Sequence, residues 1–262
     1  MPILAISTNK GGVLKTSLTT NLAGVLCQQN KRVLIIDTDN QGNALLSFGI
    51  NPDQMEKTLY DVLIDGLDPN EAIVNVHENI DILPSNDDMS FFELDCLSNL
   101  EKYPEPFMLL KNAMEGFDKE YDYILIDSPP TLGLVQGNIL CYTERVLTPF
   151  QPEAYSMRSL TKILKAIQGF KEKLNPSLSV AGIVATLVDS RTTLHSQVLQ
   201  ECRKFCLHND IPMFETVIPR SVRFASSVAY ERKPATLVEK KNPLILAYFD
   251  LLEEVEGIGT KK

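Results

Sequence analysis

The sequence lacks the features of an exported or membrane-spanning protein. No run of apolar residues approaches the roughly 20 that a helix needs to cross a bilayer, although 44% of the 262 residues are hydrophobic. The chain opens directly on an apolar, strand-like run, so we expect no signal peptide. These absences favour a cytoplasmic protein, and the apolar content suits one large α/β domain with a full core.

Cysteine and histidine are scarce and scattered. The five cysteines are an odd number without paired spacing, which indicates reduced thiols and no disulfide framework. Cys202 and Cys206 stand four residues apart on an expected helix, but no nearby histidine completes a set of metal ligands. The three histidines form no cluster. We therefore expect these thiols to be core or surface side chains.

Basic residues are outnumbered overall but are unevenly distributed. The formal net charge is −9, which by itself argues against a nucleic-acid partner. Residues 151–242, however, carry 14 Lys and Arg against 8 Asp and Glu, a local charge of +6, whereas the remainder carries 11 against 26, or −15. Two interpretations stay open, a solvated helical surface or a surface that contacts a phosphate backbone.

No linker, low-complexity segment or internal repeat divides the chain, and strand-like segments alternate with helix-like ones. The expected strands are Ile3–Ser7, Arg32–Asp37, Ile80–Pro84, Tyr123–Asp127, Arg145–Pro149, Val180–Val188 and Phe214–Ile218. The main expected helices are Thr16–Gln29, Glu105–Phe117, Ser156–Lys173, Leu194–His208 and Pro243–Glu254. The pattern predicts a single α/β domain over residues 1–262, with a doubly wound, mostly parallel sheet, helices on both faces and no N-terminal helix-turn-helix.

Residues Asn51–Leu97 are the least regular part of the chain, with acidic patches and several prolines. We expect surface helices and one strand there. In a doubly wound sheet, ligands bind beyond the carboxyl ends of the strands. The polar motifs that directly follow the expected strands are therefore the candidate site.

The segment after the first expected strand has the composition of a phosphate-binding loop. It leads into an expected helix and reads Ser7-Thr8-Asn9-Lys10-Gly11-Gly12-Val13-Leu14-Lys15-Thr16-Ser17. The backbone N–H groups of such a loop and the positive end of the helix dipole favour an anion at one place. In this setting Lys15 would reach the β- and γ-phosphates of a nucleotide, and the Thr16 hydroxyl would ligate Mg²⁺.

Lys10 distinguishes this loop from ordinary phosphate loops. With it, the loop resembles the deviant Walker A motif, Lys-Gly-Gly-Val-Gly-Lys-Thr-Thr/Ser, of the ParA/MinD family of P-loop ATPases. The resemblance implies that Lys10 crosses a dimer interface to the partner subunit's nucleotide, and that Lys10 and Lys15 both act in catalysis. It also implies that the nucleotide is bound by Lys10, Gly11, Gly12, Val13, Leu14, Lys15, Thr16 and Ser17.

Leu14 departs from the family motif, which has glycine at this position. A leucine adopts a positive φ angle only at a cost of about 1–2 kcal/mol. If the family's glycine uses such an angle, this loop is strained or reshaped. If the glycine uses an ordinary angle, the leucine only adds bulk beside the phosphates. Both possibilities are open at this stage.

Two other strand ends resemble motifs of the same family and supply carboxylates. Residues 37–43 read Asp-Thr-Asp-Asn-Gln-Gly-Asn, similar to Asp-x-Asp-Pro-Gln-Gly-Asn. By this resemblance Asp39 orients or activates the attacking water, and Asp37 supports the Mg²⁺ shell. Residues 123–127 have the Walker B pattern of an apolar strand that ends in an acid, so Asp127 would hold Mg²⁺ through water. Phosphoryl transfer depends on this placement of water and neutralisation of charge.

A third segment, Thr-Val-Ile-Pro-Arg-Ser-Val-Arg at residues 216–223, resembles the Ile-Pro-Arg-Asn-Val-Arg segment of ParA proteins. In relatives this segment borders the adenine, so Pro219 and Ser221 are the candidate base contacts. Arg220 and Arg223 would face DNA phosphates, and Arg191, in a second ParA-like segment, would join them. The alternative for each arginine is an ordinary surface or salt-bridged side chain, but the local positive charge favours DNA binding.

The resemblance covers nearly the whole chain and is closest to the compact, Soj-like ParA type. It implies a slow, partner-stimulated ATPase that converts ATP to ADP and phosphate, with ATP and Mg²⁺ as cofactors. ATP would join two subunits into a homodimer that binds double-stranded DNA of the nucleoid without sequence preference. A ParB-like or cargo-adaptor protein would stimulate hydrolysis, and the role would be plasmid or chromosome partition.

Two alternatives within this family stay open. The cargo would be a protein assembly, such as a carboxysome or a chemotaxis cluster, or Leu14 would leave a non-hydrolysing or weakly hydrolysing ATP-gated scaffold. A MinD-like membrane role is disfavoured, because the apolar segment 244–254 is acidic on its other side and an anionic membrane would repel it. We expect this segment to pack on the core. Metabolic relatives are disfavoured because the sequence has no glutaminase-type Cys/His arrangement, and nitrogenase iron proteins because Cys96 and Cys141 lack the setting of cluster ligands near the Walker B region.

Overall fold

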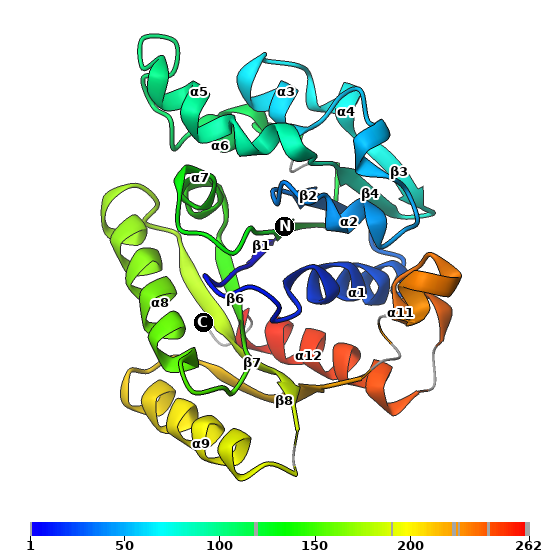
Figure 1. Cartoon of the computed structure of the whole chain (residues 1–262), viewed down its shortest axis with the longest axis vertical. Helices are drawn as coiled ribbons and strands as arrows, with labels where there is room; N and C mark the ends of the chain where they lie inside the picture. Colours follow the sequence, from blue (N-terminus) through cyan, green and yellow to red (C-terminus); the bar gives the residue numbers. More distant parts are fainter. Residues whose placement is uncertain are drawn as a thin grey trace.

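The computed structural model describes residues 2–117, 120–189, 191–221, 224, 226–239 and 242–259. Its centre is an eight-stranded sheet in the order β3-β4-β2-β5-β1-β6-β7-β8 (Figure 1). Neighbouring strands are parallel except for the antiparallel pair β3 and β4. The strands are β1 Ile3–Ile6, β2 Val33–Asp37, β3 Val74–His77, β4 Ile80–Leu83, β5 Tyr123–Asp127, β6 Arg145–Phe150, β7 Ser179–Val188 and β8 Met213–Pro219.

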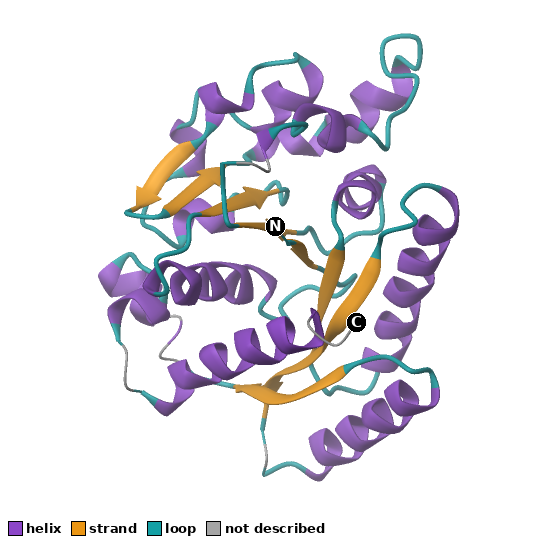
Figure 2. Ribbon diagram, turned by 180° about the vertical axis from the view of Figure 1, so that it is seen from behind, coloured by secondary structure: helices purple, strands orange, loops and turns teal. Residues whose placement is uncertain are grey.

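Helices cover both faces of the sheet (Figure 2). The α-helices are α1 Lys15–Gln28, α2 Asn43–Leu46, α3 Leu59–Ile64, α4 Pro69–Ala72, α5 Phe92–Ser98, α6 Leu109–Ala113, α7 Leu134–Tyr142, α8 Ser156–Lys173, α9 Thr193–His208, α11 Ala235–Val238 and α12 Pro243–Gly259. Short 3₁₀ turns, η1 Pro52–Gln54 and η2 Asp87–Ser90, and a π-helical turn, η4 Ser227–Glu231, complete the described elements. The doubly wound, mostly parallel sheet predicted from the sequence is therefore confirmed.

The two layers of helices follow from the alternation of side chains along each strand. In β1, Leu4 and Ile6 belong to the core shared with α1 and α12, whereas Ile3 and Ala5 belong to the core shared with α3, α5, α6 and α7. Successive side chains of a strand point to opposite faces, so a strand that is apolar at every position needs cover on both sides. This explains why β1 is a continuous apolar run.

The C-terminal helix packs on the core, as the sequence predicts. Tyr248 and Leu251 of α12 are completely buried, and the ring of Tyr248 meets that of Phe224 edge to face at 5.4 Å between centroids. Helix α12 lies beside α1 on one face of the sheet (Figure 1). No helix within the described ranges combines the length and hydrophobicity that a membrane crossing requires.

Two expectations about the less regular regions need correction. Residues 51–97 contain two strands, not one, because β3 pairs antiparallel with β4 at the edge of the sheet. As an edge strand β3 is only partly buried and includes Asn75 and His77, so its sequence does not look like a core strand. The helix expected over Glu105–Phe117 is shorter, α6 at Leu109–Ala113, since its start is displaced past the turn that contains Pro106.

Candidate nucleotide-binding site

The three motifs meet because the strands that carry them are neighbours in the middle of the sheet. Strand β5 lies between β1 and β2, with Asp127 in register with both Ile6 and Asp37. The carboxyl ends of parallel strands lie at one edge of the sheet. The loop that follows β1 therefore stands directly beside the two carboxylates at the ends of β2 and β5.

An open cleft of about 600 Å³ lies at this edge. The loop residues 11–17 form one wall, and Asp39 and Ser221 lie on others. The remaining lining residues, which sequence reasoning did not single out, are Thr20, Asn21, Asn43, Leu46, Ser47, Pro130, Phe224, Val228 and Ala229. Of these, Asn43 carried a signal as the last residue of the motif at residues 37–43. The volume falls within the usual range of about 300–1,000 Å³ for small-molecule sites.

Helix α1 presents a free N-terminus to the cleft. The helix begins at Lys15, its N-cap residue Leu14 provides no side-chain hydrogen bond, and its first turn contains no acidic residue. The first N–H groups of a helix have no partner within the helix, and the helix dipole makes this end attractive to anions. The geometry is therefore that of an anion site, as the motif predicts.

Lys15 is buried beside this anion site. Its side chain is among the buried charged groups, and its Nζ donates a hydrogen bond of 3.3 Å to the backbone oxygen of Lys10. Burial lowers the pKa of Lys15, while the negative charges of Asp127 and Asp39 act in the opposite direction. An ammonium group held in this way is placed to meet a phosphate without leaving its position.

The backbone of Leu14 resolves the question that its sequence left open. Leu14 has φ 71° and ψ 26°, in the left-handed region. A leucine in this region destabilises the backbone by about 1–2 kcal/mol, whereas a glycine adopts the same angles without this strain. Its side chain packs against the core that lies under α1, and this packing offsets part of the cost. The loop of this chain is therefore strained at the position where the family motif has glycine.

The two strand-end carboxylates are completely buried but differ in their hydrogen bonds. Asp37 accepts from the N–H groups of Asp39 at 3.1 Å and Ala44 at 2.9 Å, so it braces the loop that follows β2. Asp127 accepts a long bond of 3.5 Å from Thr19, and its Oδ2 has no hydrogen-bond partner within the described part of the chain. Burial raises the pKa of Asp127 to about 7 and, helped by the charge of Asp127, raises that of Asp37.

This donor set fits a hard divalent cation. The unpaired, buried carboxylate oxygen of Asp127 is a costly group that a bound cation would compensate. The neighbouring Thr16 hydroxyl counters the rise in the pKa of the same carboxylate. Mg²⁺ prefers oxygen ligands and keeps several waters, so Thr16 and Asp127 are the residues of this chain that would hold it. Asp37 stands behind them as a brace.

Lys10 lies outside this cleft. Its Nζ donates to Glu153 Oε2 at 2.6 Å and to Ser156 Oγ at 3.3 Å, on the far side of the loop. It lines a narrow crevice between the loop and the β6–α8 connection. Sequence reasoning missed Glu153 and Ser156, because they are 143 and 146 positions away from Lys10 in the sequence and no local pattern could have revealed them.

The other predicted contacts are partly placed by the structure. Ser221 lines the cleft, whereas Pro219, at the end of β8, is not among the lining residues. Arg220 is exposed. Arg191 is also exposed, and its guanidinium pairs with both carboxylate oxygens of Asp189, at 2.9 and 2.7 Å. Arg223 lies outside the described residues.

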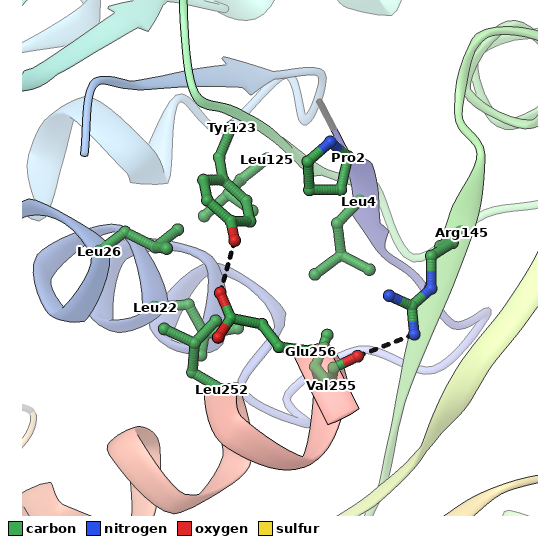
Figure 3. Close-up of a pocket in the computed structure, with 10 residues that line it drawn as sticks. All are labelled: Pro2, Leu4, Leu22, Leu26, Tyr123, Leu125, Arg145, Leu252, Val255 and Glu256. Carbon is green, nitrogen blue, oxygen red and sulfur yellow. Dashed lines mark hydrogen bonds between the residues drawn. The ribbon is translucent and has the colours of Figure 1, made fainter. Parts of the chain in front are cut away.

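A second cavity, of about 410 Å³, lies at the opposite, amino-terminal edge of the sheet (Figure 3). Leucines from β1, α1, β5 and α12 line its interior. The polar groups at its rim are paired with each other or with the backbone. The Tyr123 hydroxyl donates to Glu256 Oε1, and Arg145 Nη2 donates to the Val255 oxygen at 2.9 Å. Among the described residues that line this cavity, none belongs to a helix N-terminus and the one carboxylate, Glu256, accepts from Tyr123, so the cavity does not resemble a phosphate site.

The parallel sheet, the loop between β1 and α1 and the carboxylates of the neighbouring strands define a P-loop nucleotide-binding protein with a deviant Walker A loop. Known proteins agree with this class. The family model described as "AAA domain" matches residues 1–180. The sporulation initiation inhibitor protein Soj of Bacillus subtilis is 34% identical, over 98% of this chain and 99% of the relative. The chromosome partitioning protein ParA of Caulobacter vibrioides is also 34% identical, over 97% and 93%.

Solved structures show the same fold. The crystal structure of cobyrinic acid a,c-diamide synthase from Mycobacterium smegmatis with bound ADP and magnesium superposes with a TM-score of 0.81. It is 29% identical and covers 98% of this chain and 96% of that one. The near-complete coverage by relatives above 30% identity shows that this chain belongs to the ParA/Soj family.

Proposed function

We propose that this protein is an ATPase that uses ATP and Mg²⁺ to switch between a single subunit and a DNA-binding dimer. The observation that carries the proposal is that Lys15 and the free N-terminus of α1 line one cleft, while the negative charge of buried Asp127, whose Oδ2 has no partner within the described residues, acts on Lys15. The phosphates of a nucleoside triphosphate would supply the negative charge that Lys15 and the helix N-terminus attract, and its cation would supply the positive charge that Asp127 attracts. The ADP and magnesium in the M. smegmatis relative support the same ligands.

Each group then has a distinct task in hydrolysis. The loop N–H groups and Lys15 bind the phosphates, and the cation supplies neutralisation of charge on the phosphate oxygens. Asp39 lines the cleft, and its Oδ1 accepts the N–H of Gln41 in its own turn at 3.1 Å. Within the described residues no hydrogen bond occupies its other carboxylate oxygen, so Asp39 can orient a water. Asp37 keeps this turn in place through the N–H groups of Asp39 and Ala44.

Lys15→Ala tests the hydrolytic step. Loss of a charged phosphate contact in a buried site lowers activity by about 10²–10³-fold, and we expect nucleotide affinity to fall as well. The matched control is Lys57→Ala, which removes the same charge from an exposed pair with Glu71 in the acidic part of the chain. Equal hydrolysis of ATP by the Lys15→Ala and wild-type proteins would contradict the assignment of the cleft.

The DNA-binding half of the proposal rests on the local charge of +6 over residues 151–242 and on the exposed Arg220. Arg191 contributes less to the proposal, because Asp189 already neutralises it. We expect a random-sequence duplex to bind with ATP and Mg²⁺, and neither with ADP nor without nucleotide. Binding should weaken steeply between two salt concentrations, since each phosphate contact releases counterions.

Arg220→Ala should weaken DNA binding and reduce its dependence on salt by about one counterion, with Lys57→Ala again as the control for charge. Binding that is the same in every nucleotide state would contradict an ATP-dependent switch. The name of the ParA relative, a chromosome partitioning protein, favours partition of DNA as the role. A ParB-like or cargo-adaptor partner would stimulate hydrolysis, and a protein cargo is the alternative within the same mechanism.

A weakly hydrolysing switch is a second candidate, and the backbone of Leu14 favours it. The left-handed conformation of this leucine strains the phosphate loop. The loop therefore has less freedom to change its backbone on nucleotide binding than a loop with glycine at this position. In this case ATP binding and dimer formation persist while turnover is slow. Comparison of Leu14→Gly with the wild-type protein separates the two candidates.

A further inference from the structure

We infer that Glu153 is a positioning residue that holds Lys10 within its own subunit and has to release it when two subunits join. The inference rests on the proposed dimer switch, in which Lys10 reaches the nucleotide of a second copy of this chain. Its starting point is the geometry of Lys10, whose ammonium contacts Glu153 and Ser156 on the far side of the phosphate loop. A side chain cannot hold this position and also cross to another subunit.

Glu153 is held firmly enough to act as a restraint. It lies in the connection between β6 and α8, where its N–H donates to Ser156 Oγ at 3.2 Å and its backbone oxygen accepts from the Ser156 N–H at 3.0 Å. Gln151, which is buried, donates from Nε2 to the other carboxylate oxygen, Oε1, at 2.6 Å. One oxygen of Glu153 is thus fixed by the protein, and the other is left for Lys10.

Ser156 completes the restraint. Its buried hydroxyl oxygen contacts both the Glu153 N–H and the Lys10 ammonium. Two of the three N–H donors of Lys10 are therefore satisfied within the subunit. The Lys10 and Glu153 side chains are 26% and 45% exposed, so water reaches the pair and the ion pair can open without a large rearrangement. This is the behaviour expected of a contact that forms and breaks during a cycle.

The exposure also sets the size of the effect. Exposed or half-exposed ion pairs change an equilibrium by about 1.4- to 5-fold. A symmetric dimer breaks one pair in each subunit, so the two factors multiply to roughly 2- to 25-fold in the dimer dissociation constant. Removal of the Glu153 charge should therefore favour the dimer by this factor, and only when Lys10 is present.

Arg220 and His195 decide which measurement is informative. Both act on Glu153 electrostatically and, after Lys10, lower its pKa. Loss of the Glu153 charge would by itself strengthen the attraction of a nearby Arg220 to DNA. DNA binding is therefore a poor readout for this inference, and dimer formation in the absence of DNA is the better one.

The test measures the dimer dissociation constant by sedimentation velocity without DNA, with Mg²⁺ and the non-hydrolysable analogue AMPPNP. Glu153→Gln should dimerise about 2- to 25-fold more tightly than wild type, whereas Glu153→Asp, which keeps the charge, should stay close to wild type. In the Lys10→Ala background, Glu153→Gln should have no effect. Thermal melting of each variant without nucleotide confirms that it is folded.

The outcomes are distinct. A dimer that is no tighter in Glu153→Gln than in wild type would overturn the restraint and leave the dimer switch intact. A gain of the same size in the Lys10→Ala background would also overturn it, because Glu153 would then act independently of Lys10. A wild-type protein that stays a single subunit at all AMPPNP concentrations would overturn the switch itself, and the inference with it.

Discussion

The two edges of the central sheet use the same strands in opposite ways. At the carboxyl edge, buried Asp37 and Asp127 meet a strained loop, and one carboxylate oxygen of Asp127 has no partner among the described residues. At the amino edge, the rim groups Tyr123 and Arg145 are paired, and the interior is aliphatic (Figure 3). The carboxyl edge keeps a polar group without a hydrogen-bond partner, whereas the polar groups at the rim of the amino edge are paired.

The difference shows which edge destabilises the fold and which edge stabilises it. Unpaired buried charge and a left-handed leucine both destabilise the protein without ligand, and such features persist only when the surrounding structure holds them. The amino edge provides part of that support, because α12 packs there against α1 and the strands. Substitutions at the two edges should therefore separate stability from activity, and four predictions test this.

The largest effect on stability is expected from the buried face of α12. Leu251 is completely buried in the core, and Leu251→Ala should lower the free energy of unfolding by about 2–5 kcal/mol. Leu252, one residue further along the helix, lines the existing cavity. Leu252→Ala should cost near the lower end of this range, because the new space joins a void that is already present. Urea denaturation measures both values.

Hydrolysis per folded molecule should be unchanged in both leucine variants, since neither leucine lines the nucleotide cleft. Equal losses of stability in Leu251→Ala and Leu252→Ala would mean that the cavity does not reduce the cost of truncation. A loss of hydrolysis without a loss of stability would contradict the view that the amino edge determines stability and the carboxyl edge determines activity.

The next effect is on activity, at the carboxyl edge. Asp127→Asn should lower ATP hydrolysis by about 10²–10³-fold, since a buried group that neutralises charge in the transition state is lost. The melting temperature without nucleotide should not fall, because burial disfavours the charged form of Asp127 and raises its pKa. The control is Asp122→Asn, an exposed residue just before β5 at the amino edge, which should hydrolyse ATP normally.

A smaller effect is expected from the strain at Leu14. Leu14→Gly and Leu14→Ala both lose the packing of the leucine, but only glycine relieves the positive φ angle. We expect the glycine variant to be more stable than the alanine variant by about 1 kcal/mol, measured by urea denaturation. A rise in hydrolysis in Leu14→Gly alone would support the weakly hydrolysing switch. Equal stability of the two variants would show that the angle carries no cost.

The smallest effect concerns the rim of the amino-edge cavity. Tyr123→Phe removes the hydrogen bond to Glu256 and should lower the free energy of unfolding by about 1 kcal/mol. Tyr230→Phe is the matched control, because Tyr230 is 86% exposed and loss of its hydroxyl group should hardly change the free energy of unfolding. Thermal melting compares the two, and similar shifts would mean that the Tyr123–Glu256 contact does not stabilise α12.

Much of the site could be predicted because its groups are local to strand ends. Asp37 and Asp127 directly follow apolar runs, and the loop with Lys15 leads into a helix, so each motif contains its own structural context. The edge strand β3 was missed for the opposite reason: its partial burial leaves a mixed sequence. Phe224, Val228 and Ala229 in the cleft wall carry no chemical signature that distinguishes them from core residues.

The order of apolar runs and polar strand ends was enough to establish the parallel sheet, its covered faces and the loop that follows β1, since these depend on neighbours in sequence. Three features needed the folded chain: the left-handed angle of Leu14, the unpaired oxygen of Asp127 and the contact of Lys10 with Glu153. Each arises where segments far apart in the sequence pack together. Backbone strain, burial and ion pairing at such places depend on distances between elements, and a linear pattern does not contain those distances.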